Sequence, residues 1–152
     1  MKNLAACCLI IGLLLVSCSQ KEIFFEFRAF DDARWARQDT AVFLPVIADC
    51  SKTYDVTVEV RNDNNYPFQN IWLFIDRKSP SGEIRSDTIT ADLADVYGRW
   101  YGKGLTLHCL KIPLKTGETF SEPGIYEYRI RQGMRENPLR GISDLGLKIS
   151  GK

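Results

Sequence analysis

The stretch Tyr54-Asp55-Val56-Thr57-Val58-Glu59-Val60-Arg61 decides the fold class of this chain. Apolar and polar side chains alternate along it, and a period of two is the signature of a β-strand that buries one face. Residues 62–67, which follow directly, are rich in asparagine, aspartate and proline, the residues that favour tight turns. We therefore expect a half-buried strand that ends in a turn and is followed by a returning strand.

Segments of similar character lie on both sides of this strand. They predict further strands, separated by turns, over 23–27, 41–47, 70–75, 83–90, 105–112, 126–131 and 145–149. Because proline lacks the N–H that a sheet needs, Pro45 should interrupt one strand and Pro113 should end another. Residues 91–97 could add a short helical turn, but no stretch shows sustained helical periodicity. The sequence thus predicts an all-β fold, a single antiparallel β-sandwich of about seven to nine strands.

Two tryptophans have expected structural roles. Residues 70–75 are apolar on both faces, which predicts a central strand with Trp72 packed in the core. Trp35 interrupts the otherwise polar segment 31–39, and its indole is expected to plug the edge of the domain.

The N-terminal stretch Leu15-Val16-Ser17-Cys18 predicts export and lipid attachment. The apolar run 4–16 is shorter than the roughly 20 residues of a spanning helix, and Ser17 has the small side chain of a secretory cleavage site. A cysteine directly after that site matches the bacterial lipobox, whose thiol is acylated. We predict a signal peptide over 1–17, a short tether over 18–21 that begins with lipidated Cys18, and a β-sandwich domain over 22–152. An ordinary signal peptide with an incidental cysteine is the alternative.

The mature chain is electrically neutral. The full sequence has 20 basic and 19 acidic side chains, and the loss of Lys2 with the signal peptide leaves 19 of each. A neutral domain lacks the basic surface of a nucleic-acid-binding protein, so we expect no nucleic-acid partner. Cys50 and Cys109 could form a disulfide after export, or could be two separate core thiols. The absence of a dense disulfide pattern favours separate thiols.

Catalytic and metal-binding motifs are absent from the sequence. His108 is the only histidine, and Cys109 should point to the opposite face of the same strand. Neither a multi-histidine zinc site nor CxxC, HExxH, GxSxG or phosphate-loop spacing is present. The acidic residues Asp87, Asp92 and Asp95 lack EF-hand spacing, so solvated loop acids are expected. We predict no enzyme activity, no metal and no cofactor apart from the covalent lipid on Cys18.

Aromatic and basic residues are the remaining candidates for function. One group is Arg99, Trp100 and Tyr101, in a loop flanked by glycines, and the other is the crossover that contains Met134 and Arg135. Tryptophan, tyrosine and arginine dominate the hot spots of protein interfaces, so these five residues are candidate binding residues. Their aromatic rings could equally stack on sugar rings, and Trp100 could instead cap an open end of the sandwich.

An ordered set of segments resembles the gliding-motility lipoprotein family GldH. The segments are 60–61, 66–67, 70–75, 98–104, 124–126, 132–135, 139, 141–142 and 144–147. The resemblance spans nearly the whole mature domain and follows the lipobox.

The resemblance implies a non-enzymatic envelope lipoprotein that supports gliding motility and docks to the gliding and type IX secretion machinery. The family has no established catalytic residues, and Cys18 alone transfers with a chemical role, as the lipid attachment point. Residues 19–21 lack an acidic run, so we expect a domain anchored to the outer membrane and facing the periplasm. A β-sandwich lipoprotein that binds glycans or peptidoglycan is the alternative function.

Overall fold

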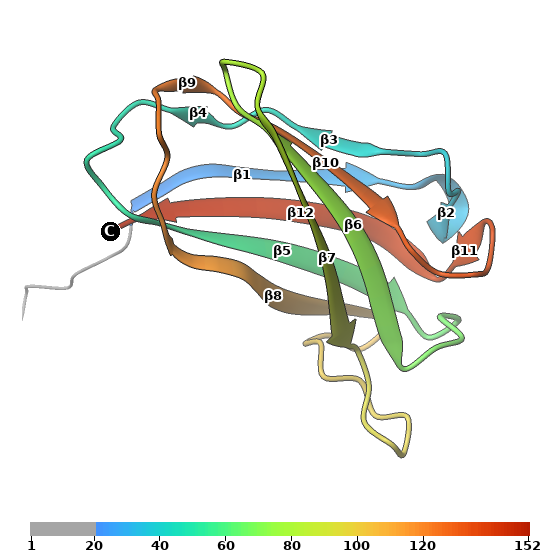
Figure 1. The fold of residues 1–152 in the computed structure, drawn as a ribbon. Helices are drawn as coiled ribbons and strands as arrows, with labels where there is room; N and C mark the ends of the chain where they lie inside the picture. Colours follow the sequence, from blue (N-terminus) through green and yellow to red (C-terminus); the bar gives the residue numbers. More distant parts are fainter. Residues whose placement is uncertain (1–20) are drawn as a thin grey trace, which may run out of the picture.

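The computed structural model describes residues 21–152, which form two four-stranded antiparallel sheets packed face to face (Figure 1). The first sheet has the strand order β1-β12-β5-β8, and the second has the order β3-β10-β6-β7. Two short pairs, β4 with β9 and β2 with β11, add to them. The elements are β1 (Lys21–Ala29), η1 (Asp31–Ala33), β2 (Arg34–Trp35), β3 (Ala41–Phe43), β4 (Val46–Ile47), β5 (Tyr54–Asp63), β6 (Asn70–Lys78), β7 (Ile84–Asp92), β8 (Leu107–Glu118), β9 (Gly124–Ile125), β10 (Glu127–Gln132), β11 (Leu139–Arg140) and β12 (Ile142–Gly151). The predicted all-β sandwich is confirmed, whereas the signal peptide and Cys18 lie outside the described residues.

The first sheet follows directly from the alternation in 54–61. Val56, Val58 and Val60 of β5 pair with Ile149, Leu147 and Leu145 of β12, and all six side chains are fully buried. The intervening residues of β5 point to the outer face of the sheet. The inward row therefore supplies one wall of the core, as the alternation predicts.

The second sheet supplies the opposite wall of the core. Ile71, Leu73 and Ile75 of β6 point inward and are buried, whereas Trp72 and Phe74 lie on the outer face and are exposed. The expectation that Trp72 packs in the core is therefore wrong. The strand is central in its sheet, but within 21–152 no third layer covers its second apolar face.

Two local expectations are also corrected. Pro113 does not end its strand, because β8 is the edge of the first sheet and Pro113, paired only with Thr57, can leave its missing N–H on the open side. Residues 91–97 contain no helical turn, since β7 continues to Asp92 and the chain then forms a bridge between Ala94 and Trp100. Other expectations are confirmed: Pro45 separates β3 from β4, and Trp35 is fully buried and stacks on Phe30 with ring centroids 4.4 Å apart.

The sandwich has two distinct ends. Lys21 pairs with Gly151, Gly151 pairs with Tyr54, and Tyr54 pairs with Glu118, so these residues define one end, which we call the N-terminal end. The opposite end, which we call the distal end, contains the turn between β5 and β6 and the long loop between β7 and β8 (Figure 1).

Cys50 and Cys109 are free, half-buried thiols in the structure. Cys109 pairs with Arg61, whereas Cys50 precedes Tyr54 at the other end of β5. Tyr54 and Arg61 are seven residues of strand apart, or about 23 Å, and Cys50 lies four residues before Tyr54, whereas the Cα atoms of a disulfide lie less than about 7 Å apart. The structure therefore does not bring the two thiols together. Burial raises the pKa of the Cys109 thiol, whose sulfur lies 3.5 Å from Glu59 Oε2.

Candidate functional site

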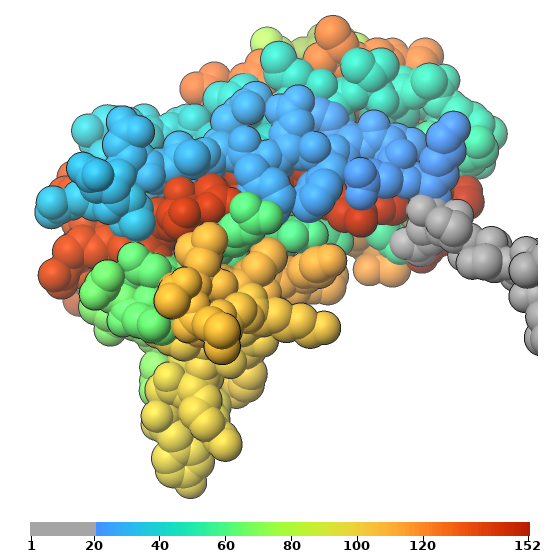
Figure 2. All heavy atoms as spheres, turned by 180° about the vertical axis from the view of Figure 1, so that it is seen from behind, coloured from blue at the N-terminus to red at the C-terminus, as the bar shows by residue number. Residues whose placement is uncertain are grey.

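The loop between β7 and β8 projects beyond both sheets, as Figures 1 and 2 show. Asp95 organises its tip, because its carboxylate accepts hydrogen bonds from the backbone N–H groups of Tyr97 and Arg99, each at 2.9 Å. The Arg99 guanidinium donates a third bond at 2.7 Å. Val96 and Tyr97 are consequently the most exposed side chains of the tip.

The hydrogen bonds to Asp95 should make the tip sensitive to acid. The backbone N–H of Arg99 is the largest cause that lowers the pKa of the Asp95 carboxyl below its ordinary value of 3.8. These bonds are therefore complete above pH 3.8 and are lost as the pH falls through the lower, folded-state pKa. The amide proton shifts of Tyr97 and Arg99 should titrate together with a midpoint below pH 3.8 in NMR spectra. Asp95→Asn should abolish this titration, and a midpoint at or above 3.8 would contradict the assignment.

Trp100 turns away from the exposed tip and caps the distal end of the sandwich. Its indole Nε1 donates to Asn64 Oδ1 at 3.1 Å, and its ring stacks on His108 with centroids 5.6 Å apart. The ring of Tyr66 packs near the same indole, with ring centroids 6.3 Å apart. Arg99 and Tyr101 remain exposed on either side, so the three predicted residues do not form one continuous exposed surface.

His108 takes part in this cap and not in a catalytic group. The ring is buried, and its Nε2 lies 2.8 Å from Asn64 Oδ1. Its Nδ1 has no partner within the described residues, so no base, nucleophile or acid approaches it there. Nor does any cluster of three or more histidine, cysteine, aspartate or glutamate side chains suited to a metal ion occur in residues 21–152.

The crossover after β10 continues alongside β6, since the Gly133 N–H donates to the Trp72 carbonyl oxygen at 2.7 Å. Met134 is largely buried, its sulfur accepts from the Trp72 N–H at 3.4 Å, and its own N–H donates to Gln132 Oε1 at 2.7 Å. The Arg37 guanidinium donates to the carbonyl oxygens of Met134 and Arg135 at 3.1 and 3.0 Å. These hydrogen bonds hold the backbone of the crossover in a defined conformation next to β6.

We use the term aromatic face for Trp72, Phe74, Gly133, Met134 and Arg135. Trp72 and Phe74 are 44% and 42% exposed, which is high for side chains on a central strand. Gly133 lies between them, since a Cβ there would come within 3.1 Å of the Phe74 ring and 3.2 Å of Trp72 Cβ. A larger residue would displace the rings, so glycine allows both to lie on the sheet.

Two shallow hollows flank the middle of the aromatic face. One, of about 350 Å³, is lined by Phe74, Arg131, Arg37 and the crossover, and the other, of about 310 Å³, by Trp72, Phe68, Asn70 and the crossover. Arg131 forms an ion pair with Asp76 at 2.9 Å, whereas the Arg135 guanidinium has no ion pair among residues 21–152. The surface therefore combines flat apolar rings with two cations, Arg37 and Arg135, that form no ion pair among residues 21–152.

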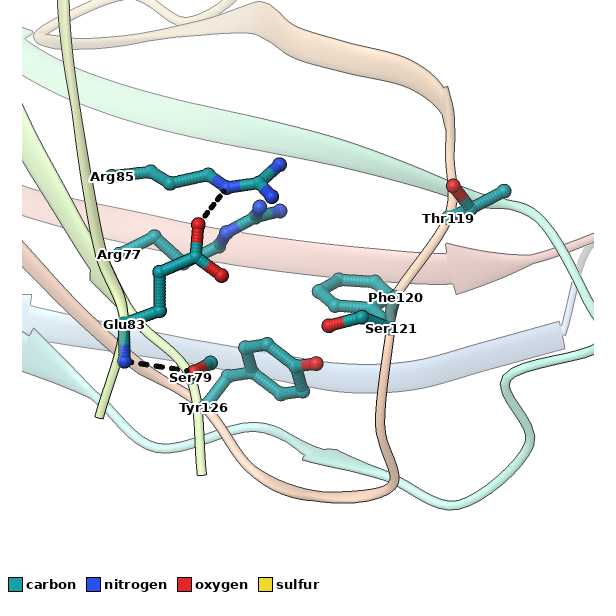
Figure 3. Close-up of a pocket in the computed structure, with 8 residues that line it drawn as sticks. All are labelled: Arg77, Ser79, Glu83, Arg85, Thr119, Phe120, Ser121 and Tyr126. Atoms are coloured by element: carbon teal, nitrogen blue, oxygen red, sulfur yellow. Dashed lines mark hydrogen bonds and ion pairs between the residues drawn. The ribbon is translucent and has the colours of Figure 1, made fainter. Parts of the chain in front are cut away.

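A third hollow, of about 170 Å³, lies near the N-terminal end between the β6–β7 turn and the segment before β9 (Figure 3). Arg77 and Arg85 extend into it side by side. Arg85 forms an ion pair with Glu83 at 3.0 Å, Arg77 pairs with Glu118, and the Glu83 N–H donates to Ser79 Oγ at 3.1 Å. Because the charged groups neutralise one another, this hollow offers no free charge for catalysis.

A family model described as GldH lipoprotein matches residues 22–149. The chain belongs to the GldH lipoprotein family. It is 34% identical over 153 residues to the "Gliding motility lipoprotein GldH" of Flavobacterium johnsoniae, with 95% of this chain and 94% of the relative covered. It is 31% identical over 145 residues to the "Gliding motility lipoprotein GldH homolog" of Christiangramia forsetii, with 90% and 88% covered. The resemblance found in the sequence is thus confirmed.

Membership of GldH establishes a membrane-associated lipoprotein family linked to gliding motility. The names of the family and of both relatives mention no catalytic activity. No helix within residues 21–152 has the length and apolar character needed to cross a membrane.

The sequence placed Met134 and Arg135 among the candidates, but Trp72 was assigned to the core in preference to a recognition patch, and Phe74 was not considered. The structure brings all four together, and it places the Arg99–Tyr101 segment at the same distal end, beyond Phe68. The sequence does contain a signal for Trp72 and Phe74. Apolar side chains occupy both faces of the strand over 71–75, whereas a sheet with one exposed face needs only one apolar face.

Proposed function

We propose that this chain is a non-enzymatic, lipid-anchored envelope protein that supports gliding motility by docking to the gliding and type IX secretion machinery. The observation that carries the proposal is the family match over 22–149, together with two relatives named gliding motility lipoproteins. The chain acts without a metal or cofactor apart from its covalent lipid. The mutually paired charges of the described hollows and the buried His108 support this part of the proposal.

Cys18 carries the lipid, and the domain faces the periplasm from the outer membrane. Ser17 and Cys18 at the end of the apolar run support the attachment site, and residues 19–21 lack an acidic run. Each acyl chain adds about 0.8 kcal/mol per buried methylene, so two or three chains anchor the protein stably.

Docking occurs through the aromatic face. Trp72 and Phe74 are rigid aromatic side chains at the surface, and Arg135 is a free cation beside them. Aromatic and arginine side chains are enriched in interface hot spots, where they are desolvated by a partner. A partner segment with apolar side chains and a carboxylate would match both the rings and the guanidinium.

A glycan- or peptidoglycan-binding role is the second candidate, and it rests on the same exposed Trp72. Thr90 pairs with Trp72 across the sheet, so the indole has a hydroxyl group beside it as well as Arg135 nearby. A flat ring with polar neighbours suits the apolar face of a sugar.

Cross-linking in the native envelope, followed by purification of the lipidated chain, tests these proposals. The docking proposal expects defined machinery proteins among the cross-linked products, and a Cys18→Ser chain measures how much of the capture depends on the anchor. Recovery of nonspecific lipoproteins alone would contradict docking. Binding of the purified chain to peptidoglycan fragments on a glycan array, with no protein partner, would favour the second candidate.

A further inference from the structure

A strip of exposed apolar side chains lies on the short β4–β9 pair and the residue before Pro45, away from the aromatic face. Leu44, Val46 and Ile125 are 52%, 59% and 58% exposed. Val46 of β4 pairs directly with Ile125 of β9. Exposure alternates along 43–47, with Phe43 and Ile47 buried and Leu44 and Val46 exposed, so Leu44 and Val46 face the same side. We call these three residues the apolar lip.

The apolar lip lies at the N-terminal end of the sandwich. Tyr54, which pairs with Gly151 beside Lys21, contacts Phe120 with ring centroids 5.3 Å apart. Phe120 in turn contacts Tyr126 at 4.7 Å, and the Tyr126 N–H donates to the Pro45 carbonyl at 2.9 Å. This chain of contacts connects the lip to the start of β1, and Figure 1 shows β4, β9, the start of β1 and the C-terminus toward the same side.

The length of chain before β1 brings this end to the membrane. Cys18 precedes Lys21 by only three residues, which span at most about 10 Å when extended. In a membrane-anchored lipoprotein with its lipid on Cys18, the start of β1 must therefore lie within roughly that distance of the headgroups, which brings the N-terminal end toward the membrane.

We propose that Leu44, Val46 and Ile125 enter the interfacial region of the bilayer beside the acyl anchor. The inference rests on lipid attachment at Cys18, which is part of the proposed function. It adds a second, non-covalent contact that fixes the orientation of the domain.

The polar neighbours of the lip suit lipid headgroups. Lys78 of the second sheet lies near the lip, because it pairs with Glu127, two residues after Ile125, and also with exposed Ile84. Its ammonium group forms no ion pair among residues 21–152, and the neighbouring Glu127 is paired with Arg129 at 3.5 Å. An apolar strip bordered by a free cation is the composition of an interfacial membrane contact, in which lysine approaches phosphate and the apolar side chains lie deeper.

A second copy of this chain fits the lip less well. Stable protein interfaces bury about 800 Å² per partner, and three half-exposed side chains supply far less. The bilayer needs no such area, since the acyl chains hold the domain in place.

An environment-sensitive fluorophore on the lipidated protein tests the inference. A Val46→Cys chain that also carries Cys50→Ser and Cys109→Ser is labelled and reconstituted into vesicles of phosphatidylethanolamine and phosphatidylglycerol. We expect a blue shift of the emission and loss of emission when nitroxide-labelled lipid is included. The matched Tyr97→Cys chain, labelled at the distal loop tip, should show neither change. Leu44→Asn with Ile125→Asn should abolish the changes at residue 46 while the protein still floats with the vesicles.

Each remaining outcome overturns the inference in a recognisable way. Flotation without quenching at residue 46 would contradict the lip but leave the anchor intact. Energy transfer between labels at residue 46 without quenching by lipid would identify a second copy as the occupant. Failure to float would contradict lipid attachment itself, and with it both this inference and the proposed anchor.

Discussion

Replacing both Trp72 and Phe74 with alanine should reduce the recovery of cross-linked envelope partners at least about 30-fold, because truncating a hot spot costs roughly 2 kcal/mol or more. The two rings are the exposed apolar core of the aromatic face. Their loss also removes the walls of both hollows beside the crossover. Quantitative mass spectrometry of the cross-linked products measures the effect, and surface movement of cells that carry the variant provides a second readout.

Phe25→Ala is the matched control for this experiment. The exposed fraction of Phe25, 41%, is nearly the same as the 42% of Phe74, but Phe25 lies on β1 in the other sheet. Partner recovery with Phe25→Ala should equal that of the unmodified chain. Equal recovery with the Trp72 and Phe74 double variant would remove the aromatic face from docking, and Tyr97→Ala with Tyr101→Ala would then test the distal loop.

Gly141→Ala should lower the free energy of unfolding by about 2 to 5 kcal/mol. Gly141 has φ +78°, and an added Cβ would come within 2.4 Å of the Tyr66 backbone nitrogen. The left-handed backbone alone costs an L-residue about 1 to 2 kcal/mol, and displacement of packed backbone adds about 1 to 3 kcal/mol. The Gly141 carbonyl also accepts from the Asp63 N–H at 2.9 Å, so any shift disturbs the end of β5. Urea unfolding monitored by tryptophan fluorescence measures the change.

Gly98→Ala separates the two contributions to this loss of stability. Gly98 has nearly the same φ, +80°, but nothing lies within 4 Å of its added Cβ. We expect this variant to lose only the backbone contribution, about 1 to 2 kcal/mol. Equal losses for the two variants would show that the contact with Tyr66 is relieved without cost.

Alternation along the chain predicted which residues face the core but not which faces remain open. Tyr54 to Arg61 alternates clearly, and its inward valines pair with the inward residues of β12 as expected. In β6 both faces are apolar, and whether the second face is covered depends on a layer that the strand itself does not encode. The prediction that Pro113 ends its strand was wrong for a related reason. Proline is tolerated in an edge strand, and which strand forms the edge depends on the topology of the whole sheet.

The candidate site was only partly visible in the sequence. Met134 and Arg135 were recognisable as candidates by residue type. Their contact with Trp72 was not, because Trp72 and Met134 are sixty-two positions apart in the chain. The sequence left two roles open for Trp100, an exposed binding residue and a cap, because its partners Asn64 and His108 come from distant segments. Residue type therefore identified candidates, and long-range contacts decided which of them are accessible.

The ten-residue strand β5 connects the N-terminal end of the sandwich to the distal end. At about 3.3 Å per residue it spans roughly 33 Å. With the proposed anchor at one end, the domain becomes a spacer of fixed length that holds the aromatic face at a set height above its leaflet. Partners are then selected by reach as well as by chemistry, and the search for them is confined to the plane of the membrane.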